Sequence, residues 1–433
     1  MMHRLRRAEA IGWRLDRNPR FRRNLLLVFH LDRMPDLRHL QASLRRASAT
    51  WEPLRSVLHT YPCDILPPRW VADGARTPRQ GLASLPSSSN AEPQLRLQEF
   101  APLLLQAFDP EQPLWNLWGI EDVGGGEAAV LLKVHPLVAG NLDWLSLLLE
   151  PGRQPEPSLP PNVRQLQQEH WLTDLSAAAM DEAGRHATRI RRRISKAPDY
   201  ARAPRQSLQD FFENTRATAA LFGKGKRLPD TRPSQAPFLA SIRLPWDDVA
   251  ECARVTRSTI REVIMAGLAR AISDSQRGTV TCSLEDPEFP WIAKQVSLAT
   301  TAGDPRRRIR ELQHRTRPAA AEAERTFLPD TAEFLDRLPQ PLLEAAADEC
   351  FASGDFRCEL QPGLPTTAFL AGARVASLRS FQTTRGHRIA VSLIRSLEDL
   401  SIGLTLDSRA FPQPETLVNK IRAELENLMR LAG

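Results

Sequence analysis

A single histidine at the end of an apolar run is the residue of this chain best suited to chemistry. The run covers 128–134 and is apolar apart from Lys133; His135 follows it, and Gly140 comes five residues later. A neutral imidazole titrates near the operating pH and can act as a general base. A histidine after an apolar strand is also commonly a packed core residue, so this pattern alone supports both interpretations.

Length and composition indicate an ordinary globular protein of about two domains. The chain has 433 residues, 42% of them hydrophobic and 25% charged. The net charge of +7 comes almost wholly from arginine, because only six of the 58 basic residues are lysines. A surplus this small does not indicate nucleic-acid binding. It fits a protein that meets anionic ligands such as CoA, or an anionic membrane surface.

The cysteines and the other motif searches exclude several classes of site. Five cysteines are irregularly spaced and include no CxxC pair, so neither a disulfide framework nor a zinc site is expected. We find no phosphate loop, no GxSxG elbow and no cluster of metal ligands, and we expect no metal. No apolar stretch approaches the roughly 18 residues needed to cross a bilayer. The simplest expectation is a cytoplasmic protein with at most peripheral membrane contact.

Apolar periodicity predicts an α+β fold in two halves. In the first half we expect strands at 24–31, 117–122 and 128–134 and helices at 36–47, 94–107 and 142–150. The last two strands form a hairpin that delivers His135, and Asn141 is the expected N-cap of the following helix. In the second half we expect strands at 238–244, 389–393 and 400–404, helices starting at Trp246 and Thr259, and a terminal helix at 415–431. The predicted division is 1–150, a helical Pro- and Arg-rich connector at 151–235, and 236–433.

Several blocks of sequence together resemble the bacterial wax ester synthase/diacylglycerol acyltransferase (WS/DGAT) family. Val134 to Gly140 resembles the HHxxxDG signature of the wider superfamily of CoA-dependent acyltransferases and condensation domains. Pro113, Leu114 and Trp115 precede it like the family's PLW element. Blocks at 259–273, 304–309, 360–365 and 371–374 follow in the family's order. The resemblance covers roughly 20–430 and rests on the order of the blocks, because no single motif is specific.

The resemblance implies a fold and an activity. The fold would be two chloramphenicol-acetyltransferase-like subdomains in a V, with a tunnel at their interface. The activity would be transfer of a fatty acyl group from acyl-CoA, the co-substrate, to a long-chain alcohol or diacylglycerol. His135 would be the general base. No bound cofactor and no nucleic acid are expected, while a membrane or lipid-droplet surface is the expected site of contact.

The sequence departs from the family signature at several positions. The first histidine reads Val134 and the aspartate reads Ala139, while the family's Asn-Asp pair reads Arg261-Glu262. Asp143 is the nearest carboxylate; it either replaces the missing aspartate or simply complements a helix dipole. These losses favour a second hypothesis, in which the chain is a catalytically impaired scaffold that binds lipid, CoA or a partner.

Three further alternatives stay open from the sequence. A shifted alignment would make His135 the first, non-catalytic histidine and Pro136 the second. Trp115 and Trp144 line the tunnel or belong to the core, and the arginine-rich run 189–196 binds anionic membrane or CoA phosphates or is a solvated helix face. Condensation on a carrier-protein thioester would use the same histidine, but the PLW element favours the WS/DGAT interpretation.

Overall fold

The computed structural model describes most of both predicted halves. The described residues are 4–61, 67–72, 83–84, 93–124, 127–139, 145–151, 237–273, 279–285, 293–299, 304–326, 335–336, 338–351, 354–364 and 366–431. The predicted connector lies outside them except for Pro151, and so do Gly140, Asn141, Asp143 and Trp144.

The N-terminal half is built on a seven-stranded sheet. Its order is β4 (Ala83–Ser84), β5 (Trp115–Gly124), β6 (Glu127–Val134), β1 (Leu25–Leu31), β13 (Ala373–Gln382), β12 (Ala368–Leu370) and β7 (Leu149–Pro151). β1 is central and pairs antiparallel with both β6 and β13. β2 (Ser56–His59) and β3 (Arg69–Ala72) form a separate two-stranded sheet.

The C-terminal half is built on a six-stranded sheet. Its order is β10 (Ala293–Ala299), β9 (Thr279–Glu285), β11 (Phe356–Leu364), β14 (Ile389–Ser396), β15 (Asp399–Leu406) and β8 (Phe238–Pro245). β11 runs parallel to both β9 and β14, while the other pairings are antiparallel. Because β12 and β13 join the N-terminal sheet, the chain of the second half crosses into the first.

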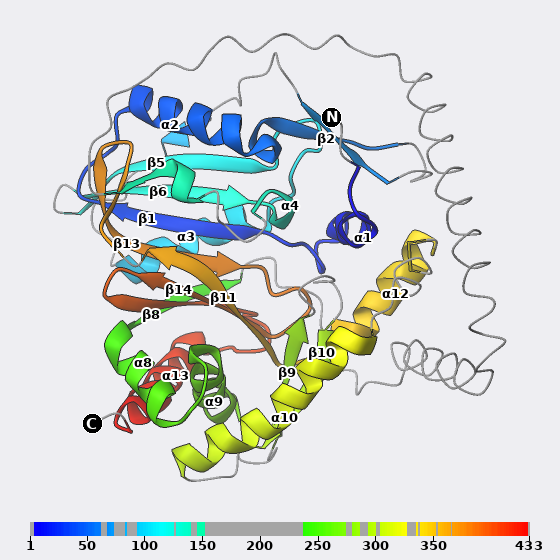
Figure 1. The fold of residues 1–433 in the computed structure, drawn as a ribbon, viewed down its shortest axis with the longest axis vertical. Helices are drawn as coiled ribbons and strands as arrows, with labels where there is room; N and C mark the ends of the chain where they lie inside the picture. Colours follow the sequence, from blue (N-terminus) through cyan, green and yellow to red (C-terminus); the bar gives the residue numbers. More distant parts are fainter. Residues whose placement is uncertain are drawn as a thin grey trace, which may run out of the picture.

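Helices cover the outer faces of the two sheets, and one helix lies between them (Figure 1). The helices are α1 (Arg7–Asp16), α2 (Leu37–Thr50), α3 (Pro93–Leu105), α4 (Pro136–Ala139), α5 (Leu145–Leu148), α8 (Trp246–Val255), α9 (Ile260–Ile272), α10 (Pro305–Thr326), α12 (Gln340–Phe351) and α13 (Pro414–Met429), with a 3₁₀ turn at Glu52–Arg55. α2 lies over the seven-stranded sheet and α8, α9 and α13 lie under the six-stranded one. α3 packs between the sheets, where it contacts β8.

Alternation along β1 divides the N-terminal half into two apolar layers. Leu25, Leu27 and Phe29 belong to the core under α2. Leu26 and Val28 face the other way, into a cluster with α3 that also takes residues from β8 and β13. Since side chains of a strand alternate between its two faces, one strand contributes to both layers. None of the described helices is long and apolar enough to cross a membrane.

Most of the predicted elements are confirmed. The α+β class, the strand at 24–31, the hairpin that ends at His135 and the buried stripe of the terminal helix are all present. The capping box at Thr259 is also present, with Glu262 completing it. The helix predicted for 142–150 is wrong at its end, because 149–151 form β7 by pairing with β12. The two-domain division and the tunnel stay predictions.

Substitution of Gly403 tests the close approach of the two sheets. A Cβ at Gly403 would lie 1.8 Å from the backbone oxygen of Ser380 on β13. Backbone cannot rotate away as a side chain can, so Gly403→Ala should lower the free energy of unfolding by about 2 to 3 kcal/mol. At the control position, Gly267, a Cβ would meet the side chain of Leu425 at 2.6 Å, and alanine also favours the helix. Urea unfolding should show a smaller loss for Gly267→Ala; equal losses would contradict the prediction.

Candidate active site around His135

Backbone hydrogen bonds fix the place where His135 leaves β6. The His135 N–H donates to the carbonyl of Leu114 at 2.9 Å, so the PLW segment holds the end of the strand. The His135 carbonyl in turn accepts from the N–H groups of Val138 and Ala139 at 2.9 and 2.8 Å, closing the short helix α4. Pro136 suits the first position of that helix because it has no N–H to satisfy.

Both ring nitrogens of His135 have hydrogen-bond partners. Nε2 bonds to Oδ2 of Asp16, and Nδ1 accepts from the N–H of Leu137 at 3.1 Å. The edges of Trp13 and Phe108 pack against the imidazole, with ring centroids 5.6 and 5.9 Å away. The residue is only 2% exposed. Because a peptide N–H occupies Nδ1, this network places the ring proton on Nε2, where it is donated to Asp16.

His135 lines a pocket of about 410 Å³ within the N-terminal half. The lining residues are Trp13, Asp16, Arg17, Arg22, Asn24, Thr60, Ala107, Phe108, Pro110 and His135. The second carboxylate oxygen of Asp16, Oδ1, is buried and has no hydrogen-bond partner among the described residues. The pocket therefore combines an apolar wall, two arginines and one carboxylate oxygen without a partner.

Asp16 owes its position to contacts between the two halves. It is the last residue of α1, whose apolar side packs on α12 of the C-terminal half. Arg14, on the same helix, donates to the carbonyls of Asp336 and Leu338 at 2.7 and 2.6 Å. These contacts clamp α1 where its last residue meets the end of β6. The geometry of the His135–Asp16 pair thus depends on residues more than 300 positions apart.

Three polar side chains, two from the segment just before β1 and one from β6, hold the segment that carries Phe108. The guanidinium of Arg22 donates to Leu105 O at 2.5 Å. The amide of Asn24 donates to the carbonyls of Leu104 and Gln106 at 2.7 and 2.9 Å. The ammonium of Lys133 donates to Gln106 O at 3.1 Å and lies 4.3 Å from the centre of the Phe108 ring. The part of the pocket wall that includes Phe108 is therefore fixed by cationic and amide donors.

Burial shifts the pKa of two of these cations. Burial lowers the pKa of Lys133 to about 8, and the positive charge of Arg22 acts in the same direction. Burial also lowers the pKa of Arg22, while the negative charge of Asp16 opposes that shift. Asp16 is therefore close enough to Arg22 to favour its charged form. The positive charge of Arg22 partly offsets the cost of burying the negative charge of Asp16.

Other residues singled out from the sequence belong to the packed core and do not line the pocket. Val134 points into the core under α2, away from the pocket, and Ala139 is buried there too. Trp115 is also in that core, with its indole N–H donating to Leu54 O at 2.7 Å, and Pro113 accepts from the Trp115 N–H at 2.8 Å. Gly140, Asp143 and Trp144 lie outside the described residues.

Arg261 and Glu262, which stand where the family has its Asn-Asp pair, lie at the start of α9. Glu262 accepts from the Thr259 N–H at 2.7 Å in the capping box of α9. Its carboxylate also pairs with Arg317 at 3.1 Å, which joins α9 to α10. Neither Arg261 nor Glu262 lines the pocket at His135. Glu262 thus stabilises the C-terminal half, and neither residue is part of the candidate site.

Sequence reasoning missed Asp16 and the helix that carries it. The signal in the sequence is weak: Ala8, Ile11 and Leu15 recur at helical spacing, and Glu9 accepts from the Arg6 N–H at 2.7 Å to start the helix. A carboxylate at the end of a helix is unfavourable to the helix dipole. Such a placement suggests a role other than helix stability, but the sequence does not name its partner.

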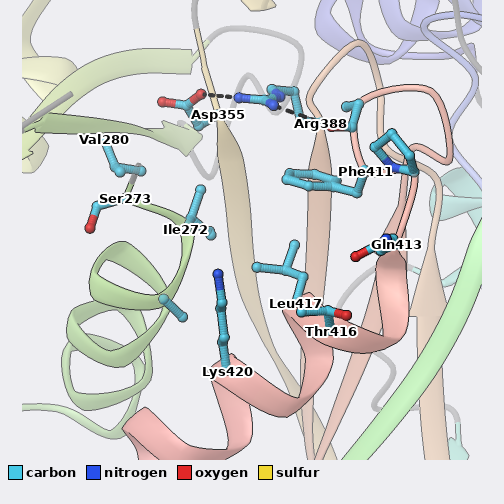
Figure 2. A pocket seen from close by; sticks show the side chains of 13 residues that line it. Ile272, Ser273, Val280, Asp355, Arg388, Phe411, Gln413, Thr416, Leu417 and Lys420 are labelled. Carbon is cyan, nitrogen blue, oxygen red and sulfur yellow. Dashed lines mark hydrogen bonds and ion pairs between the residues drawn. The ribbon is translucent and has the colours of Figure 1, made fainter. Parts of the chain in front are cut away.

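A second, larger pocket lies on the far side of the C-terminal half. It has a volume of about 760 Å³ and is bordered by α9, β9 and α13. Arg388 stands at one end, 3.4 Å from the carboxylate of Asp355 and stacked on the ring of Phe411, while Lys420 reaches in from α13 (Figure 2). It shares no lining residue with the pocket at His135. Because Asp355 already pairs with Arg388, the more buried of the two cations in this pocket is neutralised.

Comparison with known proteins bears on the fold and on the C-terminal half. Residues 293–429 match the family model described as the WS/DGAT C-terminal domain. This match covers most of the C-terminal half. The resemblance to the WS/DGAT family inferred from the sequence is thereby confirmed.

Relatives extend the likeness over the whole chain. A protein of Mycobacterium tuberculosis strain H37Rv, whose name proposes a diacylglycerol O-acyltransferase, is 22% identical over 461 residues, covering 96% of this chain and 89% of the relative. The wax ester synthase/diacylglycerol acyltransferase of Marinobacter aquaeolei VT8 has the same fold, with a TM-score of 0.60, 15% identity and 98% coverage of each chain. The starter condensation domain of rhizomide synthetase, solved with C8-CoA and Leu-SNAC, gives a TM-score of 0.53 at 12% identity, covering 100% of this chain and 94% of that one. These likenesses confirm the predicted acyltransferase- and condensation-type fold.

Replacement of Lys133 tests the electrostatics of the pocket wall. The pKa of Lys133 is about 8 in the folded protein, whereas its ordinary value is 10.5, so the unfolded chain binds more protons between pH 8 and pH 10.5. Wild-type stability therefore rises with pH across this window. Any stability advantage of Lys133→Met over wild type should fall by about 2 kcal/mol from pH 7 to pH 10. Urea unfolding at both pH values measures this, with the exposed Lys420→Met as control; an unchanged difference for Lys133→Met would contradict it.

Proposed function

We propose that the protein is an O-acyltransferase that moves a fatty acyl group from acyl-CoA to a long-chain alcohol or diacylglycerol in the pocket beside His135. The observation that carries the proposal is the buried His135–Asp16 pair on the wall of that pocket. The WS/DGAT C-terminal domain and the activity named for the mycobacterial relative support the acyltransferase class. The condensation domain solved with C8-CoA supports a CoA thioester as donor.

The proposed reaction needs one proton acceptor. The hydroxyl oxygen of the acceptor attacks the thioester carbonyl carbon, and its proton passes to a group in the pocket as the C–O bond forms. The C–S bond then breaks, and the CoA thiolate takes the proton back to leave as the free thiol. The protein returns to its starting state with no net change in protonation. His135 and Asp16 are the two groups at this site that can exchange that proton.

The hydrogen bonds favour Asp16 as the first acceptor within the pair. For His135 to take a proton at Nε2, its own proton would have to move to Nδ1, where it would face the N–H of Leu137. Two donors facing each other are unfavourable. Oδ1 of Asp16 has no such obstacle, because it has no partner among the described residues. We therefore assign the proton to Asp16, with the Nε2–H of His135 holding and stabilising the carboxylate.

The remaining walls suit the other parts of the two substrates. Arg17 and Arg22 supply positive charge, which favours both the developing thioester oxyanion and the phosphates of CoA. Trp13 and Phe108 supply an apolar surface for hydrocarbon next to the reacting atoms. Since long-chain alcohols and diacylglycerol dissolve poorly in water, we propose that the cytoplasmic protein meets them at a membrane or lipid-droplet surface.

Replacement of His135 tests whether this pocket is the active site. His135→Ala should lower acyl transfer from radiolabelled palmitoyl-CoA to hexadecanol or diacylglycerol by about 10²- to 10⁴-fold, because the pair loses its charged hydrogen bond and its shape. His39→Ala, on the exposed side of α2, is the matched control and should leave transfer unchanged. Product is measured by thin-layer chromatography.

Two outcomes would count against the proposal. Equal product from wild type and His135→Ala would place the chemistry elsewhere. Binding of palmitoyl-CoA without any product from wild type would favour the non-catalytic scaffold, in which the pocket only holds a lipid or CoA. Circular dichroism of each variant separates loss of activity from loss of fold.

A pair of conservative variants tests which member of the pair takes the proton. Asp16→Asn keeps the shape but cannot accept a proton, so kcat should fall by about 10²-fold or more. His135→Gln keeps an N–H donor near the position of Nε2 and should retain more activity than His135→Ala. If His135 is instead the proton acceptor, His135→Gln will be as inactive as His135→Ala and Asp16→Asn will be the milder change. The pH profile of kcat for both variants gives a second readout.

A further inference from the structure

Three basic side chains converge between the two sheets, at the end of β1 that lies away from His135. His30 is on β1 and Arg379 on the neighbouring β13. His30 lies opposite Ser377, and Arg379 lies opposite Val28, so His30 and Arg379 are diagonal neighbours on one face of the sheet. Arg243 is on β8, where it alternates with Ile242 and Leu244 of the C-terminal core. Arg243 therefore projects from the opposite face of that sheet, toward the N-terminal half.

The electrostatic effects on His30 and Arg379 indicate that the three groups are close to one another. Burial, followed by the charges of Arg379 and Arg243, lowers the pKa of His30 to about 4. Burial and the charge of Arg243 lower the pKa of Arg379. No carboxylate of the described residues is among the groups that shift either pKa. His30 is thus neutral at pH 7 and lies near two guanidinium groups that repel each other.

Several polar atoms at this place have no partner among the described residues. Nε2 of His30 and Nε of Arg379 are buried and make no hydrogen bond there. Oγ of Ser241, two residues before Arg243 on the same face of β8, is also buried and has no partner among the described residues. A buried donor without an acceptor costs roughly 1 to 3 kcal/mol, so native structures rarely leave several together. Such a cluster is what an anion-binding site looks like before its ligand arrives.

We propose that His30, Arg243 and Arg379, with Ser241, form a binding site for a phosphate group. A dianion with three terminal oxygens can accept from the guanidinium groups, the imidazole and the hydroxyl together, whereas a single carboxylate has fewer acceptor positions. The two positive charges match its charge. The side chain of Arg243 is exposed and those of His30 and Arg379 are half-buried, so the ligand can enter from the surface.

The site is separate from the pocket at His135 and does not depend on the proposed acyl transfer. None of its residues lines that pocket. Leu25, at the start of β1, pairs with Val134 beside His135, while His30 lies five residues further along. At about 3.4 Å per residue, the two sites are roughly 17 Å apart along the strand. The phosphate group can be a free anion or the phosphate of a nucleotide.

Isothermal titration calorimetry of the full chain tests the site. The probes are inorganic phosphate and adenosine 3′,5′-bisphosphate, with adenosine as the uncharged comparison. We expect saturable 1:1 binding of at least one phosphate compound, weakened about tenfold or more by Arg379→Gln and by Arg243→Gln, because each removes a charge-assisted hydrogen bond. Arg422→Gln, an exposed arginine on α13, is the matched control and should bind like wild type.

The outcomes separate the two sources of phosphate. Binding of inorganic phosphate as tight as that of the bisphosphate indicates a free anion, and binding of the bisphosphate alone indicates a nucleotide. Absence of binding by either compound at millimolar concentration would overturn the proposal, as would binding that survives both Arg379→Gln and Arg243→Gln. Thermal unfolding checks the variants: the ligand should raise the Tm of wild type and of Arg422→Gln but not that of Arg379→Gln.

Discussion

The buried hydrogen bond between His135 and Asp16 ties the candidate site to the assembly of the whole molecule. Asp16 ends a helix that is clamped to the C-terminal half, and His135 ends a strand of the N-terminal sheet. A buried carboxylate is expensive unless a donor and nearby positive charge compensate it. The Nε2–H of His135 and the charge of Arg22 do so here. The site therefore exists only when both halves are packed together.

This pair explains how the chain can differ from the HHxxxDG pattern and still present an organised histidine. At position 134 the strand faces the core under α2, so a second histidine there would not reach the pocket. Ala139 is buried beneath the same helix and leaves no carboxylate in the motif. The acidic group beside the imidazole comes instead from the first helix of the chain. The carboxylate beside the imidazole is thus distant in sequence but close in space.

The central strand β1 links two places of opposite electrostatic character. Near its first residue, the end of β6 brings His135 to the carboxylate of Asp16, whose Oδ1 has no hydrogen-bond partner among the described residues. Near its last residue, the charges of Arg379 and Arg243 lower the pKa of His30. Between these two places, apolar side chains of α3 pack against Leu26 and Val28 of β1.

Local patterns in the sequence determined those helices and strands whose apolar residues recur at regular spacing. The strand at 24–31, the hairpin ending at His135, the capping box at Thr259 and the stripe of the terminal helix follow from alternation, turn residues and spacing over short distances. The end of the helix expected at 142–150 was wrong because β7 exists only through its pairing with β12, more than 200 residues later. Asp16 could not be assigned to His135 for the same reason. Which carboxylate meets the imidazole, and which arginines gather around His30, depend on how distant strands and helices pack, and no periodicity along the chain records that packing.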